Sequence, residues 1–284
     1  VTGCTIVAEV LITEPPPILA NSTQTDVTCA GGCNGTISLA PSGGVGAYTF
    51  NWVPTPPIGQ GTANVAGLCA GDWSVTIGAG ACDTTITITI TEPPPMTVDL
   101  STTDVSCPGE CDGTTTAVAA GGTPPFSYTW SPNPPNGQGT PTASELCPGN
   151  YTLTVADAAG CDTTLAFVIL APTAITPALT TTPETCAGPC TGTATVAPTG
   201  GTGTILVNWQ PAPGGGQGTT TATGLCVGIN YTVTLSDANG CDTTLAFTIL
   251  PSAVIVPNIS STPVTCNGLC DGTATVGPTG GTAP

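Results

Sequence analysis

The cysteines are the residues of this chain whose type and spacing could do chemistry. Four of them recur in three consecutive segments at a period of 78 to 80 residues: Cys29, Cys33, Cys69 and Cys82, then Cys107, Cys111, Cys147 and Cys161, then Cys186, Cys190, Cys226 and Cys241. Thiols can also bind zinc. However, the third cysteine of each copy follows the second by 36 residues, and the fourth follows the third by 13 to 15 residues, so these two do not form a tight zinc knuckle. The spacing therefore predicts disulfides, formed in an oxidising compartment.

The same period predicts the domain organisation. We expect complete repeats at residues 18–95, 96–172 and 173–251, with a preceding end fragment at 1–17 and a further start fragment at 252–284. Cys4 matches the last cysteine of an earlier copy, and Cys266 and Cys270 open a later one. We therefore expect the natural chain to be longer. Proline-rich linkers such as Glu92-Pro-Pro-Pro predict a semi-rigid rod of domains.

Alternating apolar and polar residues predict short strands throughout, and no stretch of ten residues has a helical period. Trp52, Trp130 and Trp209 fall on the inward face of the third strand and are expected in the core. An aromatic residue near each third cysteine, Trp73, Tyr151 or Tyr231, resembles a tyrosine corner. About seven strands per repeat with these features predict an all-β chain of tandem immunoglobulin-like (PKD-like) β-sandwich repeats.

The composition excludes several functions. The chain has no Lys, Arg or His against 17 Asp plus Glu, so it cannot neutralise nucleic-acid phosphates or anionic membrane surfaces. No apolar run approaches the roughly 20 residues of a membrane span. Without a His or Lys base or an Arg clamp, and without an Asp-Thr-Gly or Asp-Ser-Gly tripeptide, the sequence predicts neither an enzyme nor a cofactor.

Calcium is the metal to weigh, because it prefers carboxylate ligands in glycine-rich turns. Only Asp83, Asp162 and Asp242 recur in all three copies, while Asp157 and Asp237 are replaced by Gly78 in the first. One shared carboxylate per repeat is a poor site. The sequence predicts no metal and assigns these side chains to solvated turns.

The order of motifs resembles the SprB-repeat family of Bacteroidetes cell-surface proteins. The second copy carries the resemblance in Cys111-Asp-Gly-Thr, Phe126-Ser-Tyr-Thr-Trp, Tyr151-Thr-Leu-Thr-Val and Asp157-x-x-Gly-Cys. The resemblance covers the three full copies and both end fragments. It implies giant surface adhesins, including a gliding-motility filament exported by type IX secretion, and hence an extracellular, cell-surface location.

The resemblance also bears on the disulfide pairing. Family members commonly carry only the first and last of the four cysteines, so the two additional ones suggest an additional bond. This implies a nested pairing of Cys29 with Cys82 and Cys33 with Cys69. The equivalent pairs are Cys107–Cys161, Cys111–Cys147, Cys186–Cys241 and Cys190–Cys226. Four cysteines permit three pairings, and the others remain open.

Each last cysteine is followed by Asp-Thr-Thr, which is similar to the O-glycosylation acceptor pattern of Bacteroidetes and makes Thr84, Thr163 and Thr243 candidate sites. The alternative is a threonine pair favoured simply by its position in a strand. Asn-x-Thr sequons also occur at Asn34, Asn150 and Asn230.

Together these features predict an extracellular structural or adhesive repeat fibre, a spacer rod of a large cell-surface adhesin or filament. The expected partners are neighbouring repeats and other copies in a fibre, with a surface or glycan ligand elsewhere in the parent protein. The alternatives are a passive filament or sheath without a ligand, and a spacer array attached to a secreted hydrolase.

Overall fold

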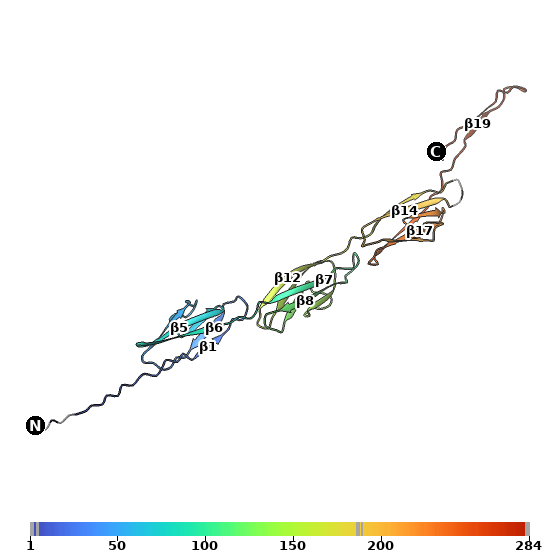
Figure 1. The fold of residues 1–284 in the computed structure, drawn as a ribbon. Helices are drawn as coiled ribbons and strands as arrows, with labels where there is room; N and C mark the ends of the chain where they lie inside the picture. The colour runs from blue at the N-terminus through green and yellow to red at the C-terminus, as the bar shows by residue number, and fades with distance from the viewer. Residues whose placement is uncertain (1–2, 4–5, 186–187, 189, 282–284) are drawn as a thin grey trace. The chain divides into compact units, whose positions relative to one another are not determined.

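The computed structural model describes residues 3, 6–185, 188 and 190–281, and over these residues the regular structure consists of antiparallel strands (Figure 1). The chain forms two compact units. One comprises Val1–Thr103 with Gly113–Ile169, and the other comprises Asp104–Asp112 with Leu170–Pro284. No helix in the described part of the chain is long and apolar enough to cross a membrane.

The predicted first repeat, residues 18–95, contains two three-stranded sheets. One sheet has the order β1-β2-β4, with β1 (Ser22–Thr25), β2 (Gly35–Leu39) and β4 (Asn64–Leu68). The other has the order β3-β5-β6, with β3 (Tyr48–Val53), β5 (Gly71–Ala79) and β6 (Cys82–Ile90). Ile37 and Leu68 from one sheet and Trp52 and Ile77 from the other share one buried core, so the two sheets form a sandwich.

The predicted second repeat, residues 96–172, has the same topology. Its sheets are β10-β8-β7 and β12-β11-β9. The strands are β7 (Thr97–Thr103), β8 (Gly113–Ala120), β9 (Ser127–Ser131), β10 (Thr142–Leu146), β11 (Gly149–Ala156) and β12 (Asp162–Ile169). Trp130, Leu146, Leu153 and Ile169 are buried in its interior.

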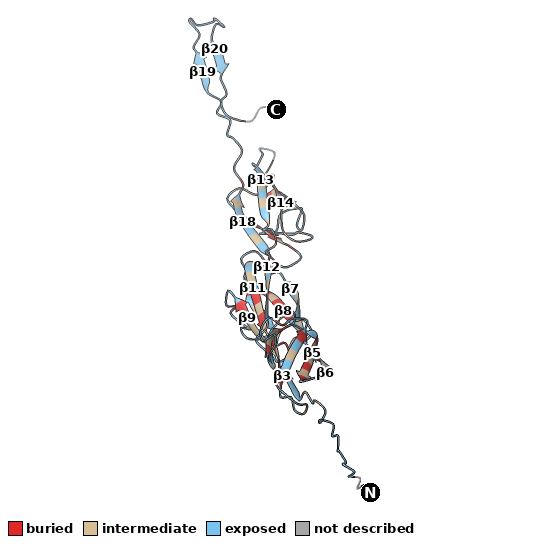
Figure 2. Ribbon diagram, turned by 90° about the vertical axis from the view of Figure 1, so that its left-hand side faces the viewer, coloured by how far each residue is buried: buried red, intermediate tan, exposed pale blue. Residues whose placement is uncertain are grey.

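The predicted third repeat, residues 173–251, lies in the second unit and has sheets β13-β14-β16 and β15-β17-β18. The strands are β13 (Thr176–Thr182), β14 (Gly192–Thr199), β15 (Leu206–Gln210), β16 (Thr221–Leu225), β17 (Asn230–Ser236) and β18 (Asp242–Thr248). The hairpin of β19 (Ile259–Thr262) and β20 (Thr273–Val276) follows, and all of its residues are exposed, whereas sandwich strands such as β5 and β9 contain buried residues (Figure 2).

These sheets confirm the predicted all-β fold of tandem immunoglobulin-like sandwiches, with six strands per repeat rather than about seven. The three central tryptophans are core residues, as predicted, with exposures of 1%, 3% and 1% for Trp52, Trp130 and Trp209. Each indole nitrogen donates to a backbone carbonyl of the loop that follows, over 2.9, 3.0 and 2.8 Å to Thr62, Thr140 and Thr219. The recurrent Gly-Gln-Gly-Thr loop therefore satisfies the one polar atom of each buried tryptophan.

Candidate functional site: the cystine junctions

The inner cysteines of a repeat join two neighbouring strands. Cys33 lies just before β2, Cys69 lies just after β4, and the first and last residues of these strands, Gly35 and Leu68, are directly paired. Cys33 is bonded to Cys69, as predicted.

The third repeat has the same arrangement. Cys190 is bonded to Cys226 beside the Gly192–Leu225 pair. In the second repeat, Cys111 and Cys147 are both disulfide-bonded, and the strands next to them pair through Gly113 and Leu146. The Cys111–Cys147 pairing itself stays a prediction.

Close packing explains the glycine two residues after the first inner cysteine of a repeat. A Cβ atom on Gly35 would lie 2.9 Å from Cγ2 of Ile90 and 3.0 Å from the carbonyl oxygen of Leu68. The equivalent distances at Gly192 are 2.6 Å to Ile249 and 2.9 Å to Leu225. The Cys-x-Gly-Thr motif therefore keeps room for the closing strand against the disulfide-bearing sheet.

An aromatic side chain fixes the third cysteine of each repeat. The indole of Trp73 donates to the carbonyl of Cys69 over 3.0 Å, and the Tyr151 hydroxyl donates to the carbonyl of Cys147 over 2.9 Å. In the third repeat the Tyr231 hydroxyl accepts from the backbone N–H of Cys226 at 2.9 Å. The hydrogen bonds back to upstream backbone are those of the predicted tyrosine corner.

The outer cysteines do not follow the nested pairing. Cys29 is bonded to Cys161, 132 residues further along the chain, and Cys107 is bonded to Cys241, 134 residues further. Cys82 is an exposed free thiol. The predicted Cys29–Cys82 and Cys107–Cys161 bonds are therefore wrong, and the Cys186–Cys241 bond is wrong as well because Cys241 has another partner. Cys186 lies outside the described residues.

The length of the closing strand explains this correction. Cys82 is the first residue of β6, which runs for nine residues. The loop that carries Cys29 lies at the other end, where Val27 donates to the carbonyl of Thr91 and Asp26 accepts from the Thr91 N–H. A strand of this length separates the two cysteines by about 27 Å, whereas disulfides need Cα atoms within about 7 Å. This distance excludes Cys82, and Cys33 and Cys69 are bonded to each other, so the partner of Cys29 lies beyond its own repeat.

The two cross-repeat junctions have the same local geometry. The sulfur of Cys161 lies 3.3 Å from the carbonyl oxygen of Thr28, and the sulfur of Cys241 lies 3.2 Å from that of Ser106. A shallow hollow opens beside each disulfide, lined by Pro95 and Met96 at one junction. It is lined by Ala174 and Ile175 at the other. The same disulfide, from the first cysteine of one repeat to the last cysteine of the next, thus occurs once in each compact unit.

A buried aspartate holds the hairpin that presents each bonded last cysteine. Asp157 is only 7% exposed and accepts backbone N–H groups of Thr123, Ala159 and Cys161, each over 2.9 Å. These bonds, first of all the one from Thr123, hold the pKa of Asp157 below its usual value, although burial opposes the shift.

Asp237 repeats the arrangement with the N–H groups of Thr202, Asn239 and Cys241, and its pKa is lowered for the same reason. The assignment of these two aspartates to solvated turns is therefore wrong. They organise the turn, and their carboxylates accept N–H groups of the turn itself and of Thr123 or Thr202.

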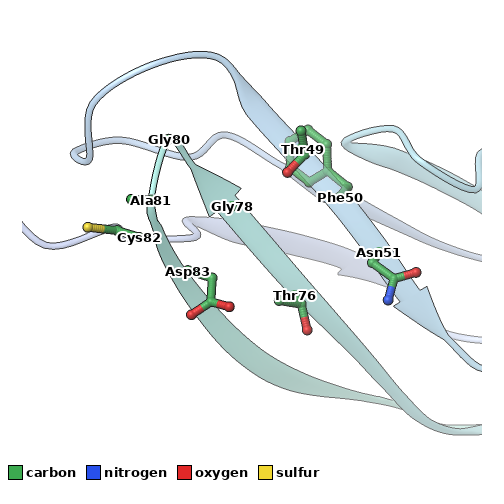
Figure 3. Close-up of a pocket in the computed structure, with 9 residues that line it drawn as sticks. All are labelled: Thr49, Phe50, Asn51, Thr76, Gly78, Gly80, Ala81, Cys82 and Asp83. Atoms are coloured by element: carbon green, nitrogen blue, oxygen red, sulfur yellow. The ribbon is translucent and has the colours of Figure 1, made fainter.

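The first repeat lacks this aspartate. Gly78 occupies the position, and the two residues Gly80 and Ala81 form a tight turn between Ala79 and Cys82, which pair directly. The Cys82 side chain projects from the start of β6, away from Thr49, Asn51 and Thr76 on the neighbouring strands (Figure 3).

The remaining predicted site residues lie at the start of the closing strands. Asp83, Asp162 and Asp242 are exposed there, and nowhere in the described part of the chain do three potential metal-ligating side chains come together. Thr84, Thr163 and Thr243 are half-buried on the inward-alternating face. The threonine after each is exposed and bonds across the strand pair, as Thr85 does with Thr76 over 2.9 Å. O-glycosylation stays a prediction.

A family comparison identifies the repeats. The SprB repeat model matches residues 21–54, 100–135 and 178–210. The chain contains SprB repeats. Each match covers the first half of an SprB repeat, including the strands on either side of its first two cysteines, and stops before the last cysteine.

Among solved structures, similarity extends along most of the chain at low identity. Sidekick-1 immunoglobulin domains 1–5 are 11% identical over 84% of this chain and 59% of that structure, with a TM-score of 0.35. The S-layer protein rSbsC(31-844) is 12% identical over 93% of this chain and 49% of that structure, with a TM-score of 0.30. The comparison with curated proteins finds no match.

Proposed function

We propose that this chain is a spacer segment of a large cell-surface adhesin or filament, whose consecutive SprB repeats are joined by disulfides as well as by the backbone. The observation that carries this proposal is the recurrence of one cross-repeat bond, Cys29–Cys161 and Cys107–Cys241, in the same register. A covalent bond from each repeat to the next suits a part that maintains distance and resists separation. It also requires an oxidising location, which supports an extracellular one.

The proposal includes the predicted domain limits at 18–95, 96–172 and 173–251. The expected partners are neighbouring repeats, other copies in a fibre, and a ligand bound elsewhere in the parent protein. Neither an enzymatic role nor a cofactor is part of it, because a chain without His, Lys or Arg offers few catalytic groups. Export by type IX secretion and glycans at Thr84, Thr163 and Thr243 belong to the same proposal.

Antibody labelling of intact source cells tests the location. An antibody raised against residues 18–251 should label cells that have not been permeabilised, while an antibody against a cytoplasmic protein should not. Labelling that appears only after permeabilisation would contradict the proposed cell-surface role.

A further inference from the structure

The two cross-repeat disulfides close loops that overlap. The first loop runs from Cys29 to Cys161 and the second from Cys107 to Cys241, so they share the segment from Cys107 to Cys161. Every peptide bond between Cys29 and Cys241 therefore lies inside at least one loop. Bonds in the shared segment lie inside both.

We propose that these overlapping disulfides make the array tolerant of backbone cleavage, so that no single cut between Cys29 and Cys241 separates the chain until the disulfides are reduced. A cut at any point in this range leaves its two sides joined by Cys29–Cys161, by Cys107–Cys241, or by both. This deepens the proposed structural role by assigning the disulfides a specific task.

The linkers between repeats are where this property matters most. Pro95, between the strands of the first and second repeats, and Ala174, between those of the second and third, are both exposed and lie outside the strands. Exposed segments without sheet hydrogen bonds are preferred sites of proteolysis. Disulfides confined within single repeats would leave both linkers unprotected, because one cut there would release a whole repeat.

The composition of the chain permits a clean test. Because there is no Lys or Arg, one introduced arginine creates the only site for trypsin. Pro95→Arg places that site in the first linker, and Ala174→Arg places it in the second. Ala253→Arg is the matched control, because position 253 is exposed and lies beyond both loops.

Each oxidised variant of the 284-residue chain is treated with N-ethylmaleimide, to prevent exchange of disulfides, and digested with trypsin in urea so that cleavage goes to completion. Gels without reductant should show the Pro95→Arg and Ala174→Arg chains as single species of uncut covalent mass. After reduction, each should separate into two fragments. The Ala253→Arg control should separate with and without reductant.

A second variant shows which bond holds the cut chain together. Pro95→Arg combined with Cys29→Ser and Cys161→Ser should release residues 1–95 without any reductant. Release of a fragment from the Pro95→Arg or Ala174→Arg chain before reduction would overturn the proposal. The test is independent of cell-surface labelling, so failure of this inference and failure of the proposed location can be told apart.

Discussion

The last cysteine of a repeat occupies the same sequence position in all three copies, but its surroundings differ between the first copy and the other two. Cys161 and Cys241 end a turn organised by a buried aspartate, and each is bonded to the first cysteine of the preceding repeat. Cys82 follows a two-residue turn beside Gly78 and is an exposed thiol. In the second and third copies this position receives its disulfide partner from the preceding repeat, so the four cysteines of one copy do not all bond to one another.

Thiol labelling should give the largest difference between these positions. N-ethylmaleimide added to the unreduced 284-residue chain should modify Cys82 almost completely, because its thiol is exposed and unbonded there, and should leave Cys161 and Cys241 unmodified. Peptide mass spectrometry after labelling measures the occupancy of each position. Protection of Cys82 together with labelling of Cys161 would abolish the distinction between the hairpins.

The inner disulfide should contribute to stability independently of the junction. Replacing Cys33 and Cys69 together by serine opens a loop of 36 residues. On the chain-entropy model this lowers the free energy of unfolding of the first repeat by about 4 kcal/mol. Urea unfolding followed by the fluorescence of Trp52 and Trp73 measures the change. An unchanged midpoint would mean that the inner bond does not stabilise the fold.

Asp157 should contribute a stability that depends on pH. Its folded pKa is lowered, mainly by the Thr123 N–H, so the contribution is complete above the ordinary Asp pKa of 3.8 and is lost as the pH falls through the lower folded value. The second repeat should therefore weaken below about pH 4 and change little from pH 5 to 8, where the chain has no histidine to titrate.

Asp157→Asn should lower the melting temperature at pH 7 by about 5 °C and reduce the loss in acid. Asp162→Asn, at an exposed position of the same repeat, is the control and should leave both nearly unchanged. Equal effects of the two substitutions would show that the buried carboxylate does not organise the turn.

The smallest expected effect concerns a core position that differs between repeats. Thr115 is fully buried and its hydroxyl has no hydrogen-bond partner, whereas the third repeat has Ala194 at this position. Thr115→Val keeps the shape and removes the unsatisfied oxygen, so it should stabilise the second repeat by about 1 kcal/mol. Urea unfolding measures it, and a loss of stability would show that the hydroxyl is satisfied in solution.

The sequence predicted the sandwich and the tryptophan core, because both depend on local alternation within one repeat. The inner disulfide Cys33–Cys69 was implied by the family resemblance, through the two additional cysteines. The sequence did not predict the outer pairing. In a tandem array the spacing from Cys29 to Cys82 and from Cys29 to Cys161 recurs equally, so periodicity alone cannot distinguish a bond within a repeat from one between repeats. The structure distinguishes the two pairings by position. The loop that carries Cys29 is hydrogen-bonded, through Val27, to Thr91 at the opposite end of the closing strand from Cys82.

The role of Asp157 and Asp237 was also missed. A carboxylate in a glycine-containing turn usually lies in solvent, and its burial here depends on the Thr123 and Thr202 N–H groups, which lie 34 and 35 residues away in the sequence. The Asp-x-x-Gly-Cys motif, present in two copies and absent from the first, was the available sign that these hairpins differ.

Direct mapping of the outer disulfides tests the central claim. The oxidised chain is alkylated, digested with pepsin at acidic pH so that the bonds do not exchange, and its linked peptides are identified by mass spectrometry before and after reduction. The account predicts linked peptides that contain Cys29 with Cys161 and Cys107 with Cys241. Peptides that link Cys29 with Cys82 and Cys107 with Cys161 would contradict it.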